Sequence, residues 1–208
     1  MPVLIILLFY IHDLVKIKRL YSQTEFVAQQ MANILQNIAK TREITKNDIK
    51  YAASLAYLTI YPGTTMYTTV SGSEKHIFGH QPRVFIHYVK GESGEKASTR
   101  WALWTRSGGG INPAEWHFSS MSNTDQSAVY YAKNATPSSE IYPTLKIEEG
   151  KPKVLIDVQI RRTGNQSARE TFGLHFVNPK YVGTNQTGYF SSVVIFTPHS
   201  GFTEKVPT

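Results

Sequence analysis

Cysteine is absent from this chain of 208 residues. Without a thiol the protein has no disulfide framework, no thiolate zinc site and no cysteine nucleophile. Acidic residues are few as well, because 15 Asp and Glu stand against 22 Lys and Arg, which gives a formal net charge of +7. The basic residues are spread along the chain, a distribution typical of a well-solvated surface rather than of one concentrated anion-binding patch.

Recognisable catalytic constellations are also lacking. The one adjacent acidic pair, Glu148-Glu149, precedes a turn signal, so the paired carboxylates of a glycosidase are not indicated. His76 and His80 are four residues apart, but a glycine and a proline beside them argue against a metal-binding helix turn. The glycines at 108–110 lack the Lys-Ser/Thr of a phosphate-binding loop. We therefore predict that the protein is not an enzyme, and we expect no catalytic residue, no cofactor-binding residue, no metal ligand and no cofactor.

Aromatic residues leave one alternative open. Trp101, Trp104 and Tyr88 could stack on sugars or bases beside Arg83 and Arg106, which would suit a basic β-rich binding module for polysaccharide or nucleic acid. Core aromatics on alternating faces of a hairpin explain the same residues at least as well. Strong, salt-sensitive retention on nucleic acid would favour the binding module.

Proline and glycine are missing between Val3 and Lys40, so nothing interrupts a helix there. Residues 3–11 are all apolar or aromatic, and a polar-faced pattern follows them. In that second part, residues recur at spacings of three and four, which predicts one long helix packing on a partner along a single stripe. We call this stripe the packing seam, and we predict that it consists of Leu14, Ile17, Tyr21, Thr24, Ala28, Met31, Leu35 and Ile38.

The apolar run 3–11 is shorter than the about 20 residues of a membrane-spanning helix. No basic region precedes it and no small-residue cleavage site follows it, so a cleavable signal peptide is not expected. Two interpretations stay open: a segment that inserts partly or packs on another protein, or the distal half of a membrane helix that begins upstream of Met1. Lys16, Lys18 and Arg19 would place this end in the cytoplasm by the positive-inside rule.

A second helix and a β-rich region follow. Thr45 stands three residues before Asp48, as in a capping box, and predicts a helix that runs to about Ile60 and ends before Pro62-Gly63. Later segments are rich in β-branched and aromatic residues, which predicts antiparallel strands. We expect these strands at 64–71, 83–89, 100–106, 154–161, 171–176 and 189–197.

These elements predict an α+β fold in which a long N-terminal helix and a short second helix pack on an antiparallel β-rich head. The expected division has three parts. Residues 1–40 form the apolar-to-amphipathic helix, a partial membrane anchor and packing seam; residues 41–63 form the second helix and a turn; and residues 64–208 form the soluble head.

The order of these features resembles the TadE/TadG-like family, the minor pseudopilins of the bacterial tight-adherence pilus system. In that family a proline-containing membrane helix leads into a Val-Ala stretch, to which Val27 to Leu35 is similar, and then into a Thr-x-x-Asp helix start like that of Thr45. The strand, turn and Trp-bearing strand that end in Trp104 to Gly108 also resemble the family, as does a later strand with an acidic residue, here Asp157. Small residues and a glutamate upstream of the proline have no counterpart, so peptidase processing is not carried over.

The resemblance implies a membrane-anchored minor pseudopilin-like structural protein that takes part in assembly of a tight-adherence type pilus or a related secretion apparatus. It implies a single transmembrane helix in the bacterial inner membrane, a head in the periplasm or outside the cell, and a link to cell adhesion. The implied partners are the membrane and other pilus or secretion subunits, bound through the N-terminal helix. Neither nucleic acid nor a small-molecule substrate is expected.

Overall fold

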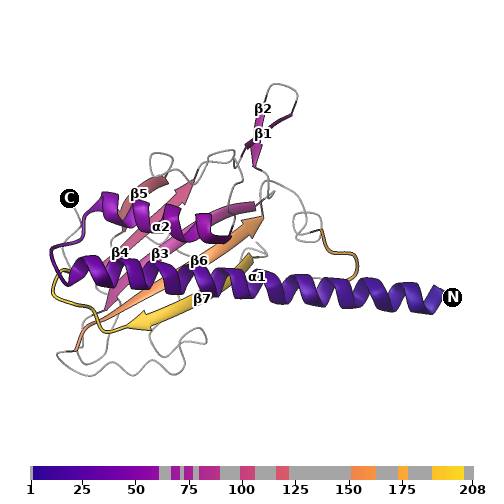
Figure 1. Ribbon diagram of the computed structural model, residues 1–208, viewed down its shortest axis with the longest axis horizontal. Helices are drawn as coiled ribbons and strands as arrows, with labels where there is room; N and C mark the ends of the chain where they lie inside the picture. Colours follow the sequence, from indigo (N-terminus) through magenta and orange to yellow (C-terminus); the bar gives the residue numbers. More distant parts are fainter. Residues whose placement is uncertain are drawn as a thin grey trace.

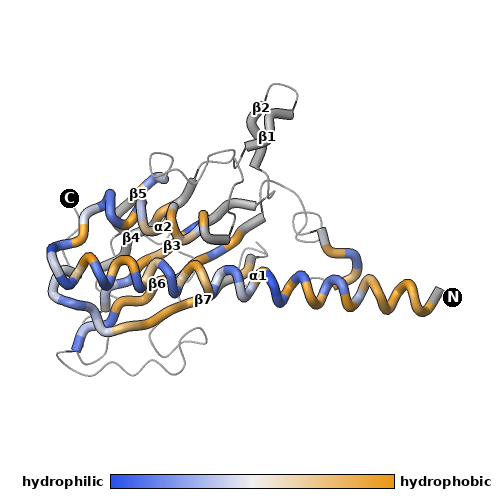
Figure 2. Tube along the Cα trace, in the orientation of Figure 1, coloured by the Kyte–Doolittle hydropathy of each residue, from blue (hydrophilic) through white to orange (hydrophobic). Residues whose placement is uncertain are grey.

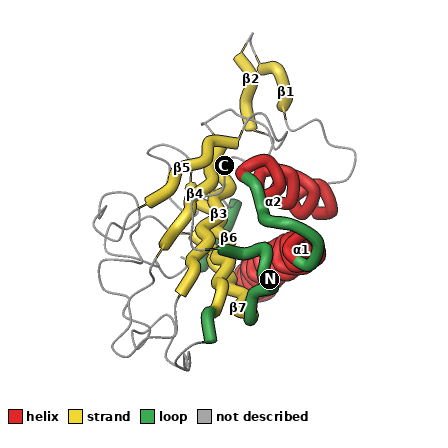
Figure 3. The backbone as a smooth tube through the Cα atoms, turned by 90° about the vertical axis from the view of Figure 1, so that its left-hand side faces the viewer, coloured by secondary structure: helices red, strands yellow, loops and turns green. Residues whose placement is uncertain are grey.

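Two helices lie on one face of an antiparallel sheet (Figures 1 and 3). The computed structural model describes residues 2–60, 67–70, 73–76, 80–89, 99–105, 116–121, 151–162, 173–177 and 189–203. The helices are α1 (Pro2–Ala39) and α2 (Lys46–Ile60). The five-stranded sheet has the order β5 (Trp116–Met121), β4 (Thr99–Thr105), β3 (His80–Val89), β6 (Lys153–Arg162) and β7 (Tyr189–Phe196). A separate hairpin consists of β1 (Tyr67–Val70) and β2 (Ser73–His76). The predicted α+β class is confirmed.

Most predicted strands coincide with observed ones, and the expected β3–β4 hairpin is antiparallel, with Arg83 opposite Trp104. The predicted strand at 171–176 is wrong over residues 173–176, which form a turn at Gly173, whose φ is +58°, and then a bend, whereas residues 171 and 172 lie outside the described part of the chain. β2 and β5 were not predicted. β2 reads Ser-Glu-Lys-His and has no apolar residue that would signal a strand.

The core lies between the sheet and the helices, with β6 at its centre. Val154, Ile156 and Val158 belong to one buried cluster together with apolar residues of α1 and α2. The intervening Asp157 and Gln159 are buried too, and the Gln159 amide donates a hydrogen bond of 2.7 Å to the Asp157 carboxylate. This strand is therefore covered on both faces, with apolar residues toward the helices and a mixed set on the other side, as its alternation predicts.

Helix α1 packs on β6 and β7 through only part of its length. The predicted packing seam is confirmed at Thr24, Ala28, Met31 and Leu35, all of which are 0% exposed. It is confirmed in part at Ile17 and Ile38, which are partly buried against the core clusters, and it is wrong at Leu14 and Tyr21, which are 46% and 41% exposed. There the inward positions are Asp13 and Leu20 instead, each one residue earlier than predicted, which corresponds to about 100° of rotation around the helix.

The C-terminal end of α1 is closed by the last described part of the chain. The Gly201 amide donates 3.0 Å to the Ala39 carbonyl, one of the acceptors that a helix end leaves unpaired, and the Gly201 carbonyl accepts 3.0 Å from the Ile44 amide. A Cβ atom at position 201 would lie 2.1 Å from the Arg42 carbonyl oxygen. Only glycine allows this close approach between the two backbones.

Helix α2 begins with the predicted capping box. The Asp48 amide donates to the Thr45 hydroxyl at 3.3 Å, and the Thr45 amide donates to the Asp48 carboxylate at 2.8 Å. Arg42 adds two hydrogen bonds of 2.6 Å to the same carboxylate. These hydrogen bonds fix the bend between the two helices.

The membrane anchor expected in residues 1–40 is not borne out. Neither helix of the described part of the chain has a stretch both long enough and apolar enough to cross a bilayer. Helix α1 is 38 residues long, but its apolar run ends at Ile11 and Asp13, Lys16 and Lys18 follow within the next turns. The predicted single transmembrane helix and the predicted inner-membrane location with an exported head are therefore corrected.

We expect Leu35→Ala and Leu14→Ala to separate the true packing seam from the predicted one. Leu35→Ala leaves a cavity in the core and should lower the free energy of unfolding by about 2–5 kcal/mol. Leu14→Ala removes an exposed side chain and should change it by less than about 0.5 kcal/mol. Urea unfolding followed by circular dichroism measures both. Equal losses in the two variants would contradict the observed orientation of α1.

Acidification should weaken the start of α2 through Asp48. Hydrogen bonds from Arg42 lower the pKa of Asp48 to about 2. The pKa of an aspartate in the unfolded chain is about 3.9. The carboxylate therefore stabilises the fold above about pH 4, and this contribution is lost as the pH falls toward about 2. The difference in unfolding free energy between the wild type and Asp48→Asn should shrink over that window. The exposed Glu25→Gln is the matched control, and a difference that does not change with pH would contradict the assignment.

Candidate interaction surface of the N-terminal helix

The first turns of α1 extend beyond the sheet (Figure 1), and their sequence is apolar (Figure 2). We call residues 3–11 the apolar tip. Every side chain in it is between 41% and 76% exposed. The tip consists of Val3, Leu4, Ile5, Ile6, Leu7, Leu8, Phe9, Tyr10 and Ile11.

Because the tip is helical and contains no polar group other than the Tyr10 hydroxyl, all of its faces are predominantly apolar. A helix that is apolar all round is ordinarily buried, either in the core of a protein or in a membrane. Contiguous exposed apolar surface of this kind marks an interaction site, since its contact with water costs free energy that burial would recover. At about 1.5 Å per residue the tip rises about 14 Å, roughly half of a bilayer's hydrocarbon core of about 30 Å.

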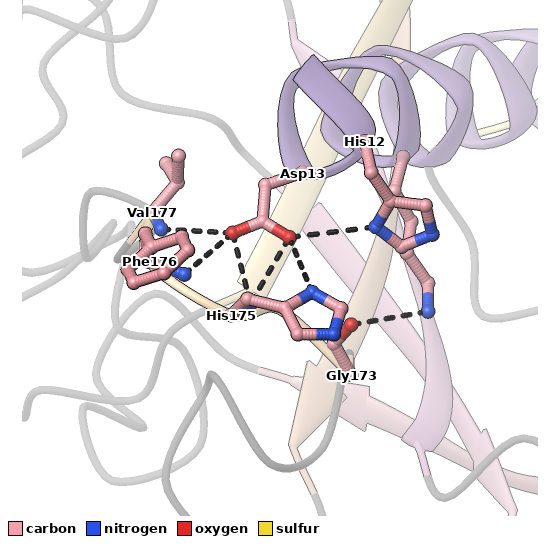
Figure 4. A network of polar contacts seen from close by, with 7 residues as sticks. His12, Asp13, Gly173, His175, Phe176 and Val177 are labelled. Atoms are coloured by element: carbon pink, nitrogen blue, oxygen red, sulfur yellow. Dashed lines mark hydrogen bonds and ion pairs between the residues drawn. The ribbon is translucent and has the colours of Figure 1, made fainter. Parts of the chain in front are cut away.

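At the base of the tip, a buried carboxylate joins α1 to a distant loop (Figure 4). The Asp13 side chain is 0% exposed. It accepts hydrogen bonds from three consecutive backbone amides, those of His175 at 2.8 Å, Phe176 at 2.7 Å and Val177 at 3.0 Å. Successive amides that converge in this way form a concave anion-binding nest, and here the bound anion is a side chain of the same protein.

The local sequence explains how residues 173–177 reach this position. Gly173 takes a left-handed conformation that glycine adopts without strain. Leu174 then packs into a small buried cluster with Leu20, Ile160 and Phe190. Its burial holds the loop against α1, so that the following amides point at Asp13. The Lys16 ammonium adds a hydrogen bond of 3.3 Å to the Gly173 carbonyl.

Electrostatics at Asp13 are a balance of two opposed effects. Burial by itself would raise the pKa of this carboxyl, because it disfavours the charged form. The amides of Phe176, Val177 and His175, together with the His175 imidazole, outweigh burial and hold the pKa of Asp13 well below its usual range. The group is therefore a carboxylate at neutral pH, and the nest stabilises its charge where water cannot.

Aromatic rings cover one side of the tip's base. The Phe9 ring lies 4.5 Å from the His175 ring and 6.3 Å from the Phe176 ring, measured between centroids. His12 and His175 meet edge to face at 5.3 Å. Such arrangements are favourable for aromatic pairs. Residues 173–177 thus support the helix at the point where it leaves the head, and the tip beyond them is exposed.

Other candidates considered from the sequence do not assemble into a site within the described residues. His76 ends β2 and His80 begins β3, so the two are not on one helix turn. Trp116 is buried at the start of β5, and its indole NH donates 2.9 Å to the Ser54 hydroxyl on α2. Glu148-Glu149 and the glycines at 108–110 lie outside the described residues. The Asp13 cluster was not predicted because its members lie 162 residues apart in sequence.

Comparisons of this chain with protein-family models, with curated proteins and with solved structures found no match. The resemblance to TadE/TadG-like proteins therefore stays a prediction from the sequence.

Removing the Asp13 carboxylate should release residues 173–177 from α1. Asp13→Ala leaves three part-buried amides without their acceptor, which should lower the free energy of unfolding by about 1–3 kcal/mol. Hydrogen exchange of the amides of residues 175–177 should accelerate, because these amides lose their hydrogen bonds. Glu25→Ala removes an exposed acid from the same helix and serves as the control. Unchanged exchange at residues 175–177 in Asp13→Ala would contradict the nest.

Proposed function

We propose that this protein is a structural, pilin-like subunit that joins a larger assembly by packing its apolar tip against the corresponding helices of neighbouring subunits. The assembly that fits the family resemblance is a tight-adherence type pilus or a related secretion apparatus. The single observation that carries the proposal is the exposure, between 41% and 76%, of every side chain in an uninterrupted apolar helix segment at the end of an otherwise packed element.

The division of labour along α1 supports this function. From Leu20 to Ala39 the helix buries one stripe in its own head, whereas every side chain from Val3 to Ile11 is exposed. A subunit that uses one continuous helix both to hold its head and to contact its neighbours passes load directly between the two. The long N-terminal helix and antiparallel head also agree with a pilin-like arrangement.

The chemistry of the tip favours helices as the occupant of this surface. Residues 3–11 carry no charge and, apart from the Tyr10 hydroxyl, no side-chain hydrogen-bonding group, so recognition has to come from apolar packing. Large aliphatic side chains at seven positions and aromatic ones at Phe9 and Tyr10 can interdigitate with a helix of the same kind. Like tips of neighbouring copies supply such helices.

The double substitution Leu4→Asp with Leu8→Asp should abolish self-association of the full chain. The two leucines are 57% and 58% exposed and lie on one face of α1, so the charges disrupt the tip without touching the core. We expect concentration-dependent association of the wild type in sedimentation velocity, its loss in the double variant and an unchanged melting temperature. Ser22→Asp, a charge at an exposed polar position of the same helix, is the matched control.

Two outcomes would overturn this proposal. One is a wild-type chain that stays monomeric at its highest soluble concentration. The other is co-sedimentation with lipid vesicles that the double variant loses, because the occupant of the tip would then be lipid rather than protein.

A further inference from the structure

Two imidazoles face the same carboxylate oxygen at the base of the apolar tip (Figure 4). The His175 Nδ1 lies 3.1 Å and the His12 Nδ1 3.5 Å from Asp13 Oδ1. One ligand atom from each of the three residues can be chosen so that all three lie within 4.8 Å of one another. The residues come from two elements, with His12 and Asp13 on α1 and His175 on the loop that docks against it.

The two oxygens of Asp13 have different roles. Oδ2 accepts the amides of Phe176 and Val177 and the shorter contact from the His175 amide. Oδ1 shares the His175 amide at 3.0 Å and otherwise faces the two rings. The nest therefore fixes the position of the carboxylate through one oxygen and leaves the other directed at two potential nitrogen ligands.

Two of the three distances between ligand atoms, those from the carboxylate to the two imidazoles, match a small four-coordinate metal ion. Ligand atoms that lie about 2.0–2.2 Å from Zn²⁺ in a tetrahedron are about 3.3–3.6 Å from each other. The Oδ1 distances of 3.1 Å and 3.5 Å to the imidazole nitrogens are close to this edge. The side chains of His12 and His175 are 53% and 43% exposed, so both rings can rotate to complete the geometry, and the fourth position opens to water.

We propose that His12, Asp13 and His175 form a binding site for a divalent transition-metal ion of the Zn²⁺ class. Two imidazoles and one carboxylate are a donor set that suits zinc and its neighbours, whereas Ca²⁺ and Mg²⁺ prefer oxygen ligands throughout. The ion would link α1 to residues 173–177 at the point where the apolar tip leaves the head. Metal binding would therefore stiffen the base of the tip.

Calorimetric titration of the tag-free full chain with Zn²⁺ tests this site. We expect one saturable site, with affinity reduced about tenfold or more in His12→Ala and in His175→Ala, since even the loss of a group that only supports a metal ligand costs at least that much. His199→Ala is the matched control, because His199 is an exposed histidine away from the cluster and should leave the affinity unchanged. Added Zn²⁺ should also raise the melting temperatures of the wild type and of His199→Ala, but not those of His12→Ala and His175→Ala.

A second measurement works without any variant. On addition of Zn²⁺, the imidazole NMR signals of His12 and His175 should shift together in the wild type. Equal zinc affinity in the wild type and in the His12→Ala/His175→Ala double variant would overturn the proposal, as would shifts confined to other histidines. Self-association plays no part in either readout, so the Leu4→Asp/Leu8→Asp chain should bind zinc normally whether or not the proposed assembly function holds.

Discussion

The rest of this structure depends on which face of helix α1 is turned toward the sheet. Helix α1 has to bury a stripe of its second half on β6 and β7 while its first half extends away from the head. Apolar packing between Leu20 and Ala39 favours this orientation, but packing alone is non-directional. The Asp13 carboxylate supplies direction, because three consecutive amides bind it in one place only. The contact between Asp13 and these amides therefore also orients the apolar tip, which precedes Asp13 in the same helix.

The sequence predicted the parts of the fold whose signals are local. Spacings of three and four identified the inward residues from Thr24 to Leu35, and the Thr45 to Asp48 capping box located α2. The pattern failed at Leu14 and Tyr21, where apolar residues stand next to the positions that face inward. Periodicity ranks a leucine above an aspartate as a buried residue, and it contains no information about the amides that make burial of Asp13 favourable.

The candidate metal cluster and the nest could not be predicted from the sequence for a different reason. Their partners are separated by 162 residues, and backbone amides have no residue-type signature that a sequence motif could express. Gly173 was the available hint, since an isolated glycine before an apolar residue often marks a left-handed turn. The sequence nevertheless predicts a strand at 171–176, because Thr171 and Phe176 are typical strand residues. The apolar tip, in contrast, can be identified from the sequence alone, because residues 3–11 are all apolar or aromatic.

The contacts of α1 with segments far along the chain limit when this helix can complete its packing during synthesis. Along α1, Asp13 binds residues 175–177, Thr24 contacts Ser192 at 2.7 Å, and Ala39 is closed by Gly201. On the ribosome α1 emerges before these partners, since Asp13 and His175 are 162 residues apart and Thr24 and Ser192 are 168 residues apart. Such long sequence separations slow folding and leave apolar surface uncovered for the duration of synthesis. Helix α1 is therefore made long before β7, one of the strands on which it packs.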